Sequence, residues 1–505
     1  MAAKKKSKSP ASEQPAAASS GDGRELIGLE EAIELLKTTR PTFYRWLKTG
    51  KLKGLKAGRQ WRFHREDLER FMQGEAPRET LPTDIGPLLK QLREYAKRTG
   101  RESSPASDEG NLATAVNLMI LEAVAVHASD IHLEGTTRAG FNEAIGRLRF
   151  RVDGALQAVA EFDLRLLKPL IERWKRLAHC DLNVNNLPQD GRIELKVRGR
   201  TLDIRVSFVP GLFGEGLTAR LLDPSQVALD LERVDFAPAD RARIERLLKL
   251  PWGMVLCTGP AGSGKTTVLY ACLKRINSPD RKVISIENPV EYLIPGVVQL
   301  QVRGPLTFPV LMRSALRGDP NVLLIGELRD QETVQVAMEA ALTGHLVLSS
   351  MHTDEAASAL IRLCDIGIDP FVIAESVKLI VAQRLVRKLC AECKRKAEPA
   401  PHLLEQAMRL ARTGGLNWGE LPPNFHAPGG CKACNQTGYR YRTVIAETLE
   451  VTGKIAGALM RRASADELRM LAVGEGMTTF IADGIRRAAL GETTLEEVLR
   501  HAHAE

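Results

Sequence analysis

One stretch near the middle of the chain, 252-WGMVLCTGPAGSGKTTVLYACLKRI-276, limits the fold more than any other. Its apolar run from Met254 to Cys257 is typical of a buried strand, and helix-like spacing resumes at Thr266. The intervening loop matches G-x-x-x-x-G-K-[ST] in full, in the strand–loop–helix setting that gives this motif its meaning. The sequence therefore predicts an α/β domain built around this loop.

The residue types of the loop suit phosphate binding. Glycines let backbone N–H groups turn inward toward phosphate oxygens, and the following helix adds the positive end of its dipole. Lys265 is placed to reach the β- and γ-phosphates, and the Thr266 hydroxyl to ligand Mg²⁺. The predicted nucleotide-binding residues are Gly259, Pro260, Ala261, Gly262, Ser263, Gly264, Lys265, Thr266 and Thr267.

With 505 residues, the chain has room for three or four domains. No apolar run approaches the roughly 18–20 residues that span a bilayer, and the N-terminus has no apolar segment of the secretory kind, so we expect a cytoplasmic protein. Residues 1–100 carry 21 Lys/Arg against 13 Asp/Glu, whereas the rest of the chain carries 50 against 49. The basic character therefore belongs to the N-terminal fifth.

The N-terminal fifth divides into a tail and a small domain. Residues 1–23 have almost nothing to bury and are predicted to be a disordered basic tail. Residues 24–75 read as a helix from Leu26, a second helix, a β-hairpin or wing, and a closing helix. This order, with the phrase 41-PTFYRWLKTGKLKGLKAGRQWRFHREDLERF-71, resembles the winged helix-turn-helix of excisionase and MerR-type DNA-binding domains.

Nine basic and no acidic side chains lie between residues 40 and 65, a charge distribution typical of phosphate contact. The residues expected to contact duplex DNA are Arg45, Lys51, Arg59 and Arg62. Helix-turn-helix domains also serve in protein docking, because a fold alone does not set its ligand. Both interpretations stay open.

After a linker at 76–110, residues 111–228 are predicted to form an α+β domain of a recognisable kind. The phrases ASDIHLE, FRVDG, 188-PQDGR-192 and 216-GLTARLLD-223 resemble the domain that flanks the nucleotide in type II secretion and type IV pilus assembly ATPases. In that family, arginines of this domain close over the nucleotide. The resemblance assigns that role to Arg192, Arg205 and Arg220, while the loop at 135–146 looks longer than the family's.

Residues 229–388 match the same family's ATPase core, which implies a RecA-like fold. The acidic box 284-ISIENPVEYLIPGVVQLQV-302 offers Glu287 and Glu291, with Asn288 where the family usually has aspartate. Arg313 and Arg317 are four residues apart and so would lie on one face of a helix. In the family, arginines at these positions help hold phosphates or adjoin the subunit interface.

Two more family elements follow the acidic box. A buried strand ends in Gly326-Glu327, which resembles a Walker B element without its aspartate. Any of Glu287, Glu291 and Glu327 has the chemistry of a general base. Thr343-Gly344-His345 and His352 resemble the family's histidine box, which implies a γ-phosphate sensor or relay; a satisfied core histidine is the alternative. The predicted catalytic residues are thus Glu287, Glu291, Glu327, His345 and His352.

Four cysteines mark residues 389–440 as a metal module. Cys390-x-x-Cys393 and Cys431-x-x-Cys434 are the two pairs of a tetrahedral structural Zn²⁺ site, separated by 37 residues. A redox pair is the competitor, but it needs only one such motif. Residues 441–505 are predicted to finish the chain as amphipathic helices.

Taken together, the resemblance covers about Leu112 to Leu499 and implies a homo-hexameric ATPase using ATP, Mg²⁺ and Zn²⁺. Such a ring would act at the inner face of the inner membrane, on a platform protein of a pilus or secretion machine. The alternative is a DNA-associated motor or regulator, targeted by the helix-turn-helix domain. The sequence leaves open which machine is served and what it exports or polymerises.

Overall fold

The computed structural model describes residues 26–48, 52, 54–57, 60–72, 83–99, 112–138, 143–197, 200–222, 230–421 and 424–501. Two compact units make up the chain, residues 1–82 and 83–505. The predicted disordered tail, residues 1–23, lies outside the described residues, and so does part of the loop at 135–146.

The N-terminal unit packs helices against a three-stranded sheet in the order β1-β3-β2. Phe43 and Phe63 are buried at its centre, with ring centroids 5.1 Å apart at a near-right angle. The predicted first helix begins later than expected, because Leu26 pairs with His64 in a strand. The elements are β1 (Leu26–Gly28), α1 (Leu29–Leu35), α2 (Arg40–Lys48), β2 (Leu55–Ala57), β3 (Gln60–His64) and α3 (Arg65–Met72).

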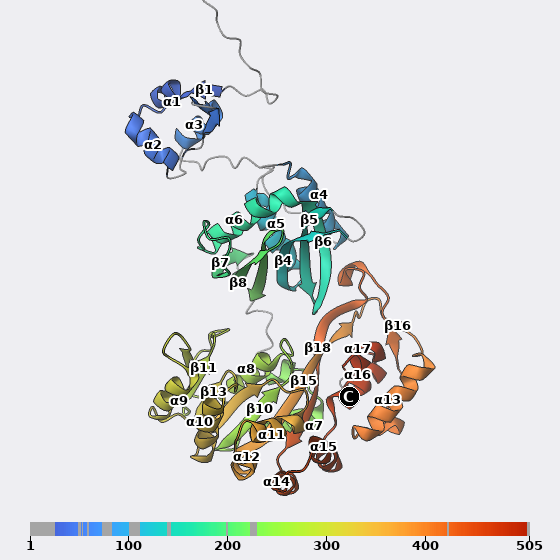
Figure 1. Ribbon diagram of the computed structural model, residues 1–505. Coiled ribbons are helices and arrows are strands. Elements are labelled where there is room, and N and C mark those ends of the chain that lie inside the picture. The colour runs from blue at the N-terminus through green and yellow to red at the C-terminus, as the bar shows by residue number, and fades with distance from the viewer. Residues whose placement is uncertain are drawn as a thin grey trace, which may run out of the picture. The chain divides into compact units, whose positions relative to one another are not determined.

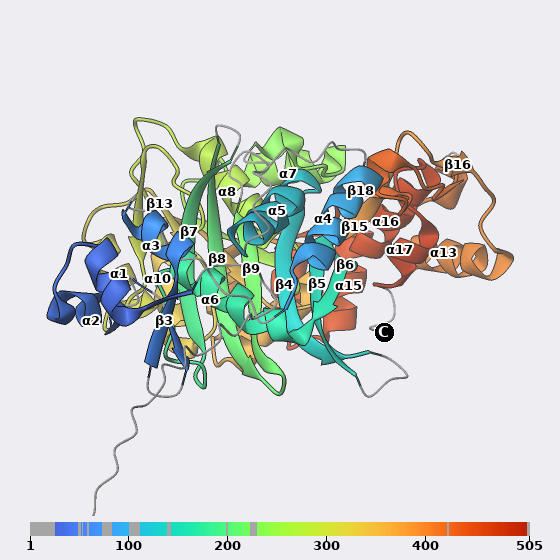
Figure 2. The same cartoon turned by 90° about the horizontal axis from the view of Figure 1, so that it is seen from above.

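The first part of the larger unit is a six-stranded antiparallel sheet in the order β6-β5-β4-β9-β8-β7, and its long strands run side by side in Figure 2. Alternate residues of β5 are buried, as a sheet with one covered face requires. The elements are α4 (Gly86–Arg98), α5 (Leu112–Ala125), β4 (Ala128–Thr137), β5 (Ala144–Val152), β6 (Ala155–Asp163), α6 (Leu167–Leu177), β7 (Gln189–Val197), β8 (Arg200–Gly211) and β9 (Gly214–Leu222).

The ATPase core is a seven-stranded sheet in the order β12-β11-β13-β14-β10-β15-β18 (Figure 1). Six strands are parallel, and β18 joins the edge antiparallel to β15. The strands are β10 (Gly253–Thr258), β11 (Val283–Glu287), β12 (Val297–Gln301), β13 (Val322–Ile325), β14 (Leu346–Met351), β15 (Val377–Leu389) and β18 (Tyr439–Glu450).

Helices cover both faces of this sheet, which explains why its strands read as continuous apolar runs. Met254 and Leu256 pack on one face with α9–α12, α14 and α15, whereas Val255 and Cys257 pack on the other with α7 and α8. The helices are α7 (Pro238–Leu247), α8 (Lys265–Ile276), α9 (Phe308–Leu316), α10 (Gln331–Leu342), α11 (Ala356–Asp365), α12 (Pro370–Ser376), α14 (Gly453–Met460) and α15 (Ala465–Gly474).

The cysteine module is inserted between β15 and β18. It contains β16 (Arg395–Lys396), α13 (Pro401–Thr413) and β17 (His426–Ala427), and it packs against α16 (Phe480–Ala489) and α17 (Leu495–Leu499). The prediction of helices from residue 441 onward was wrong for 441–450. That segment is strand β18, because its β-branched and apolar residues complete the core sheet beside β15. Within the described ranges, no helix is both long and apolar enough to cross a membrane.

Candidate functional site

The phosphate-binding loop lies at the carboxyl end of β10, between two neighbouring parallel strands. Gly259, Gly262 and Gly264 all have positive φ, at 145°, 77° and 90°, a conformation that L side chains rarely adopt. Nζ of Lys265 donates to the carbonyl oxygens of Gly259 (2.7 Å) and Pro260 (3.0 Å). Burial lowers the pKa of Lys265. The loop thus has the backbone shape and the cation that a phosphate cradle needs.

The neighbouring strand β15 holds this loop from behind. Nε2 of Gln383 donates to the Ser263 carbonyl at 2.8 Å, and a Cβ on Gly259 would lie only 2.5 Å from the Gln383 carbonyl oxygen. Arg384 donates to both the carbonyl (2.8 Å) and the side chain (3.0 Å) of Asp354. These contacts leave no room for a side chain at position 259, so the first glycine of the motif is required by packing.

Three titratable side chains meet beside Lys265. Nδ1 of His352 lies 3.4 Å from Nζ of Lys265, and its Nε2 lies 3.8 Å from the Glu327 carboxylate. Nε of Arg329 lies 2.6 Å from the same carboxylate. Burial and then the Lys265 ammonium lower the pKa of His352, so the ring is neutral near pH 7. This arrangement sets one carboxylate and one neutral imidazole next to the phosphate-binding loop.

Arg329 is a residue that sequence reasoning did not single out. Its side chain is 69% exposed, whereas that of Glu327 is 15% exposed. Its position could have indicated a role, because it follows a buried strand and lies two residues after Glu327. The carboxyl ends of parallel strands meet at one edge of the sheet, where ligands bind.

The other two predicted glutamates face different surroundings. Glu287 is 3% exposed and accepts hydrogen bonds from Tyr270, from Ser285 (2.6 Å) and from Gln299 (3.3 Å). Glu291 forms an ion pair with Arg205 at 2.9 Å. Among the described contacts, only Glu327 of the three carboxylates lies against His352.

The two predicted histidines lie at opposite ends of one strand. His352 follows the carboxyl end of β14, at the same edge as the loop, because Thr258 and Met351 are paired. His345 precedes β14, and its Nδ1 lies 3.0 Å from the Ala340 carbonyl at the end of α10. The structure does not bring His345 to Lys265.

The predicted arginines are distributed over both parts of the larger unit. Those on the six-stranded sheet are paired: Nε of Arg192 with Asp203 (2.7 Å) and Nε of Arg220 with Asp130 (3.2 Å). Arg205 also donates to the Val290 carbonyl at 2.9 Å, beside the acidic box. On and after α9, Arg313 pairs with Glu332 at 2.8 Å, and Arg317 donates to the Arg313 carbonyl at 3.1 Å. Arg313 and Arg317 are exposed and are not grouped with Lys265.

A cavity of about 460 Å³ adjoins the first turn of α8. Its walls within the core include Gly264, Thr267, Tyr292, Leu385 and Thr443. Apolar and aromatic walls with a few polar groups are usual for small-molecule sites. The position of this cavity next to the phosphate-binding loop suits a nucleoside.

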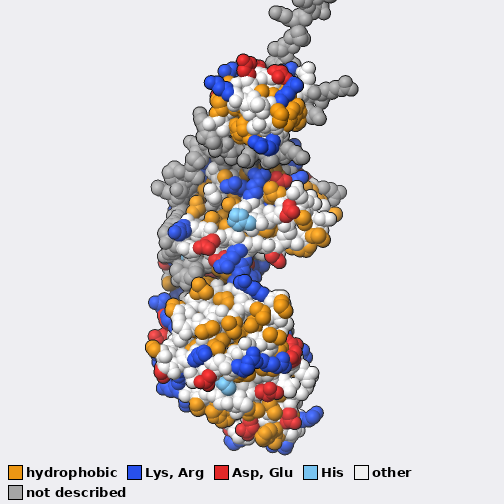
Figure 3. Space-filling model, turned by 90° about the vertical axis from the view of Figure 1, so that its left-hand side faces the viewer, with side chains coloured by type: hydrophobic (Ala, Val, Ile, Leu, Met, Phe, Trp, Pro, Cys, Tyr) orange, Lys and Arg blue, Asp and Glu red, His pale blue; other side chains and the backbone are white. Residues whose placement is uncertain are grey.

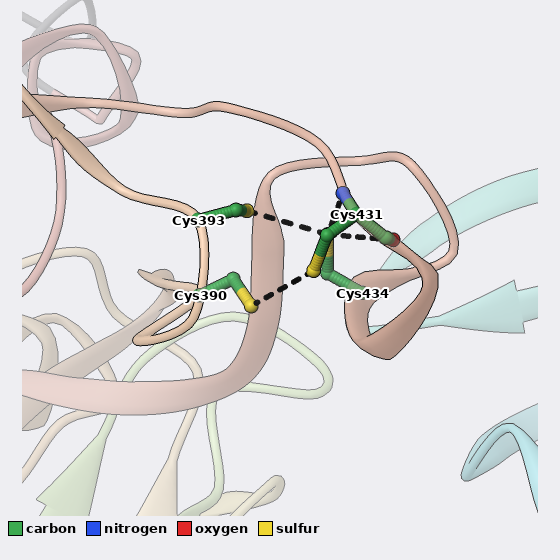
Figure 4. A group of neighbouring side chains, drawn as sticks. All are labelled: Cys390, Cys393, Cys431 and Cys434. Atoms are coloured by element: carbon green, nitrogen blue, oxygen red, sulfur yellow. Dashed lines mark hydrogen bonds between the residues drawn. The ribbon is translucent and has the colours of Figure 1, made fainter.

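The four cysteines meet in one cluster (Figure 4). The sulfur of Cys390 lies 3.8 Å from that of Cys431, Cys393 lies 3.8 Å from Cys434, and Cys431 lies 3.7 Å from Cys434. A tetrahedral zinc site with Zn–S bonds of about 2.3 Å places its sulfurs about 3.8 Å apart. Gly430 and Gly438 donate backbone N–H groups to two of the sulfurs, at 3.2 Å each. The donor set therefore fits a structural Zn²⁺.

The predicted DNA contacts are described only in part. Arg45 on α2 and Arg62 on β3 are both exposed, as a phosphate contact requires. Lys51 and Arg59 lie outside the described residues.

Comparison with known proteins finds a matching family model for each of the two units. A family model described as type II/IV secretion system protein matches residues 105–500, and a helix-turn-helix domain model matches residues 26–76. The chain is 38% identical to the type IV pilus assembly ATPase PilB of Myxococcus xanthus, over 86% of this chain and 75% of that protein. It is 43% identical to the type II secretion system protein HxcR of Pseudomonas aeruginosa, over 76% of each.

Solved structures agree on the fold. The ATPase DotB of Legionella pneumophila aligns with a TM-score of 0.57 at 20% identity, over 79% of this chain and 98% of that one. The pilus retraction motor PilT with bound ADP aligns with a TM-score of 0.50 at 23% identity, over 76% and 95%. The predicted RecA-like core is confirmed.

Proposed function

The chain belongs to the type II/IV secretion system protein family, and we propose that it couples ATP hydrolysis to pilus assembly or protein secretion. The chain is an ATP-hydrolysing enzyme by its family. The observation that carries the proposal is the meeting of Lys265, Glu327 and His352 at one edge of the core sheet.

Each of these residues has a role in the proposed reaction. Lys265 binds the β- and γ-phosphates, and the hydroxyl of Thr266 ligands Mg²⁺, which neutralises charge on the phosphate oxygens when bound. Glu327 orients the attacking water and accepts its proton, and neutral His352 contacts the γ-phosphate as a sensor. Glu287 holds α8 against β11 through Tyr270, and Glu291 holds Arg205. This assignment selects Glu327 among the three carboxylates.

The proposed working form is a homo-hexameric ring. Figure 3 shows hydrophobic side chains gathered on one face of the core, with lysines and arginines nearby. At the sheet edge, Val298 on β12 is 50% exposed, and Leu293 in the preceding loop is 85% exposed. Exposed apolar patches and unpaired sheet edges mark protein contacts. Arg192, Arg220, Arg313 and Arg317 are exposed and would complete the nucleotide site of this or a neighbouring subunit.

The proposed output is mechanical work on a membrane platform protein at the inner face of the inner membrane. The names of the two relatives, a pilus assembly ATPase and a type II secretion protein, support this assignment. ATP turnover would move the flanking sheet against the core, with Arg205 and Glu291 as one contact that must change. A bound Zn²⁺ would hold the two ends of the inserted module together, while the apolar side of α13 packs against α16 and α17.

The N-terminal helix-turn-helix domain gives a second candidate function, binding to duplex DNA. The exposed Arg45 and Arg62 favour it, while docking to a protein remains the alternative for the same surface. Affinity of the full chain for duplex DNA should fall steeply with salt, and Arg62→Ala should lower the salt slope by about 1. Absence of binding at low salt would leave the protein-docking function.

Glu327→Gln tests the main function. Turnover should fall by about 10²- to 10⁴-fold, as expected for loss of a general base, while ATP still binds. Tyr270→Phe, which leaves Glu327 in place, is the matched control. Affinity capture of the Glu327→Gln chain from its host should then recover a polytopic inner-membrane protein. Recovery of DNA alone would refute the pilus or secretion function in favour of the DNA-directed one.

A further inference from the structure

A second, larger cavity lies among the C-terminal helices, and none of its lining residues belongs to the phosphate-binding loop itself. Its volume is about 780 Å³, and it opens between the start of α11, the end of α13, helix α15 and the start of α16. Figure 1 labels these four helices. Apolar side chains form much of its wall: Leu410, Met470, Val473, Phe480 and Ile481. Met470 is 73% exposed, and flexible, polarisable methionines are typical of surfaces that bind peptides. The cavity is thus suited to apolar side chains of a partner.

The polar part of the cavity is richer in carboxylates than in cations. Three carboxylates, Asp354, Glu355 and Asp466, line it with two arginines, Arg384 and Arg469, which pair with them. A fourth carboxyl, Glu447, is buried, and burial raises its pKa to about 7, so it adds only part of a charge. The side chains of Asp354 and Asp466 are 77% and 79% exposed. Burial lowers the pKa of His501 on the same wall, so it adds no charge near pH 7. The excess of negative charge at the rim favours a cationic ligand.

One residue belongs to both the cavity and the ATP site. Arg384 binds Asp354, which follows the sensor residue His352 by two positions. The Nη1 atom of Arg384 lies only 3.2 Å from the place where a Cβ on Gly259 would be. Glu447 accepts hydrogen bonds from the N–H groups of Ala356 (2.7 Å) and Phe480 (3.2 Å), which ties α11 to α16. A ligand that engages Asp354 therefore acts on a residue, Arg384, that lies beside the phosphate-binding loop.

We propose that this cavity is the docking site for a basic segment with apolar anchors on the cytoplasmic side of the membrane partner. The proposal rests on the proposed function, which supplies a membrane partner. Cytoplasmic loops of membrane proteins carry an excess of lysine and arginine near the bilayer, so such a partner has the required charge. A lysine or arginine between Asp354 and Asp466 competes with Arg384 and Arg469 for these carboxylates. Docking and nucleotide binding are then coupled, and each changes the other by the same factor.

Site-specific photo-cross-linking in host cells tests the proposal. A benzophenone amino acid replaces Met470 at the cavity mouth in the full chain, and Glu467, exposed on the same helix but outside the cavity, is the matched control. We expect the probe at 470 to cross-link to a polytopic membrane protein with a basic cytoplasmic segment, and the probe at 467 not to. Asp466→Lys should lower the yield at 470 at least about fivefold, and Asp466→Asn should lower it less.

The outcomes separate the docking site from the function on which it rests. Equal cross-linking at 467 and 470, cross-linking of 470 to a second copy of this chain, or a yield indifferent to Asp466→Lys would each overturn the docking site. If affinity capture with the Glu327→Gln chain still recovers the membrane protein in those cases, the proposed function stands without this docking site. If no membrane partner is recovered or cross-linked by any variant, the proposed function fails with it. Basal ATP turnover of Asp466→Lys should equal that of the parent chain.

Discussion

Replacing Glu447 with glutamine is expected to remove a loss of stability that occurs as the pH rises. Glu447 lies on β18 and is 2% exposed. Burial raises the pKa of its carboxyl from 4.5 to about 7; the hydrogen bond from Ala356 opposes the rise, and the nearby Glu355 adds to it. The folded chain therefore holds this proton more tightly than the unfolded chain does. Stability from this group is present below pH 4.5 and is lost as the pH rises through about 7.

The size of the effect follows from the two pKa values. Each pKa unit is worth about 1.4 kcal/mol, so the full loss at high pH is about 3 kcal/mol. About 2 kcal/mol of it falls between pH 5.5 and 8.5. For a cooperative unit of the size of the core, this corresponds to roughly 4 °C in melting temperature.

Thermal unfolding of the parent and of Glu447→Gln at pH 5.5, 7.0 and 8.5 measures this difference. The glutamine loses one hydrogen bond with an N–H group, which costs about 1 kcal/mol at every pH. The melting temperature of Glu447→Gln minus that of the parent should therefore rise by roughly 4 °C between pH 5.5 and pH 8.5. Glu450→Gln removes an equal charge from the same strand and controls for net charge. A difference that stays flat, or that moves in favour of the parent, would refute burial as the cause of the raised pKa.

Three further perturbations have expected outcomes. Lys265→Ala should abolish phosphate release yet leave the zinc content by mass spectrometry unchanged; residual turnover would contradict its role. Tyr270→Phe removes a donor from buried Glu287, so the free energy of unfolding should fall by about 1–3 kcal/mol while kcat stays within about tenfold; a collapse of kcat would assign Glu287 to the chemistry. Cys434→Ser should lower zinc below one per chain and speed hydrogen exchange in residues 389–440; unchanged exchange would show that the metal does not hold the module.

The sequence was most informative where the chemistry is local. The phosphate-binding loop could be predicted because its strand, glycines, lysine and helix are contiguous. The cysteine pairs were equally clear, because two C-x-x-C motifs have few other uses. The helix-turn-helix order was also readable from short-range patterns.

The roles of the glutamates could not be predicted, because they depend on contacts between distant segments. Glu287 is satisfied by Tyr270 from α8 and Gln299 from β12, which no spacing along the chain indicates. His345 and His352 look equivalent in sequence, yet the length of β14 separates them. Strand β18 was missed because its partner, β15, lies 50 residues or more earlier in the chain, across the whole cysteine module.

The insertion of that module between β15 and β18 has a consequence for how the fold tolerates change. The chain leaves and returns at one point, where Leu389 is paired with Tyr439 and the Cys390 N–H donates to the Gly438 carbonyl at 2.9 Å. Because both ends of the insert meet there, a short turn could replace it and leave a hairpin of β15 and β18 with unchanged register. A protein without the insert would then need another cover for the apolar side of α16 and α17, which α13 buries here, and the same junction is a natural place to graft a reporter domain.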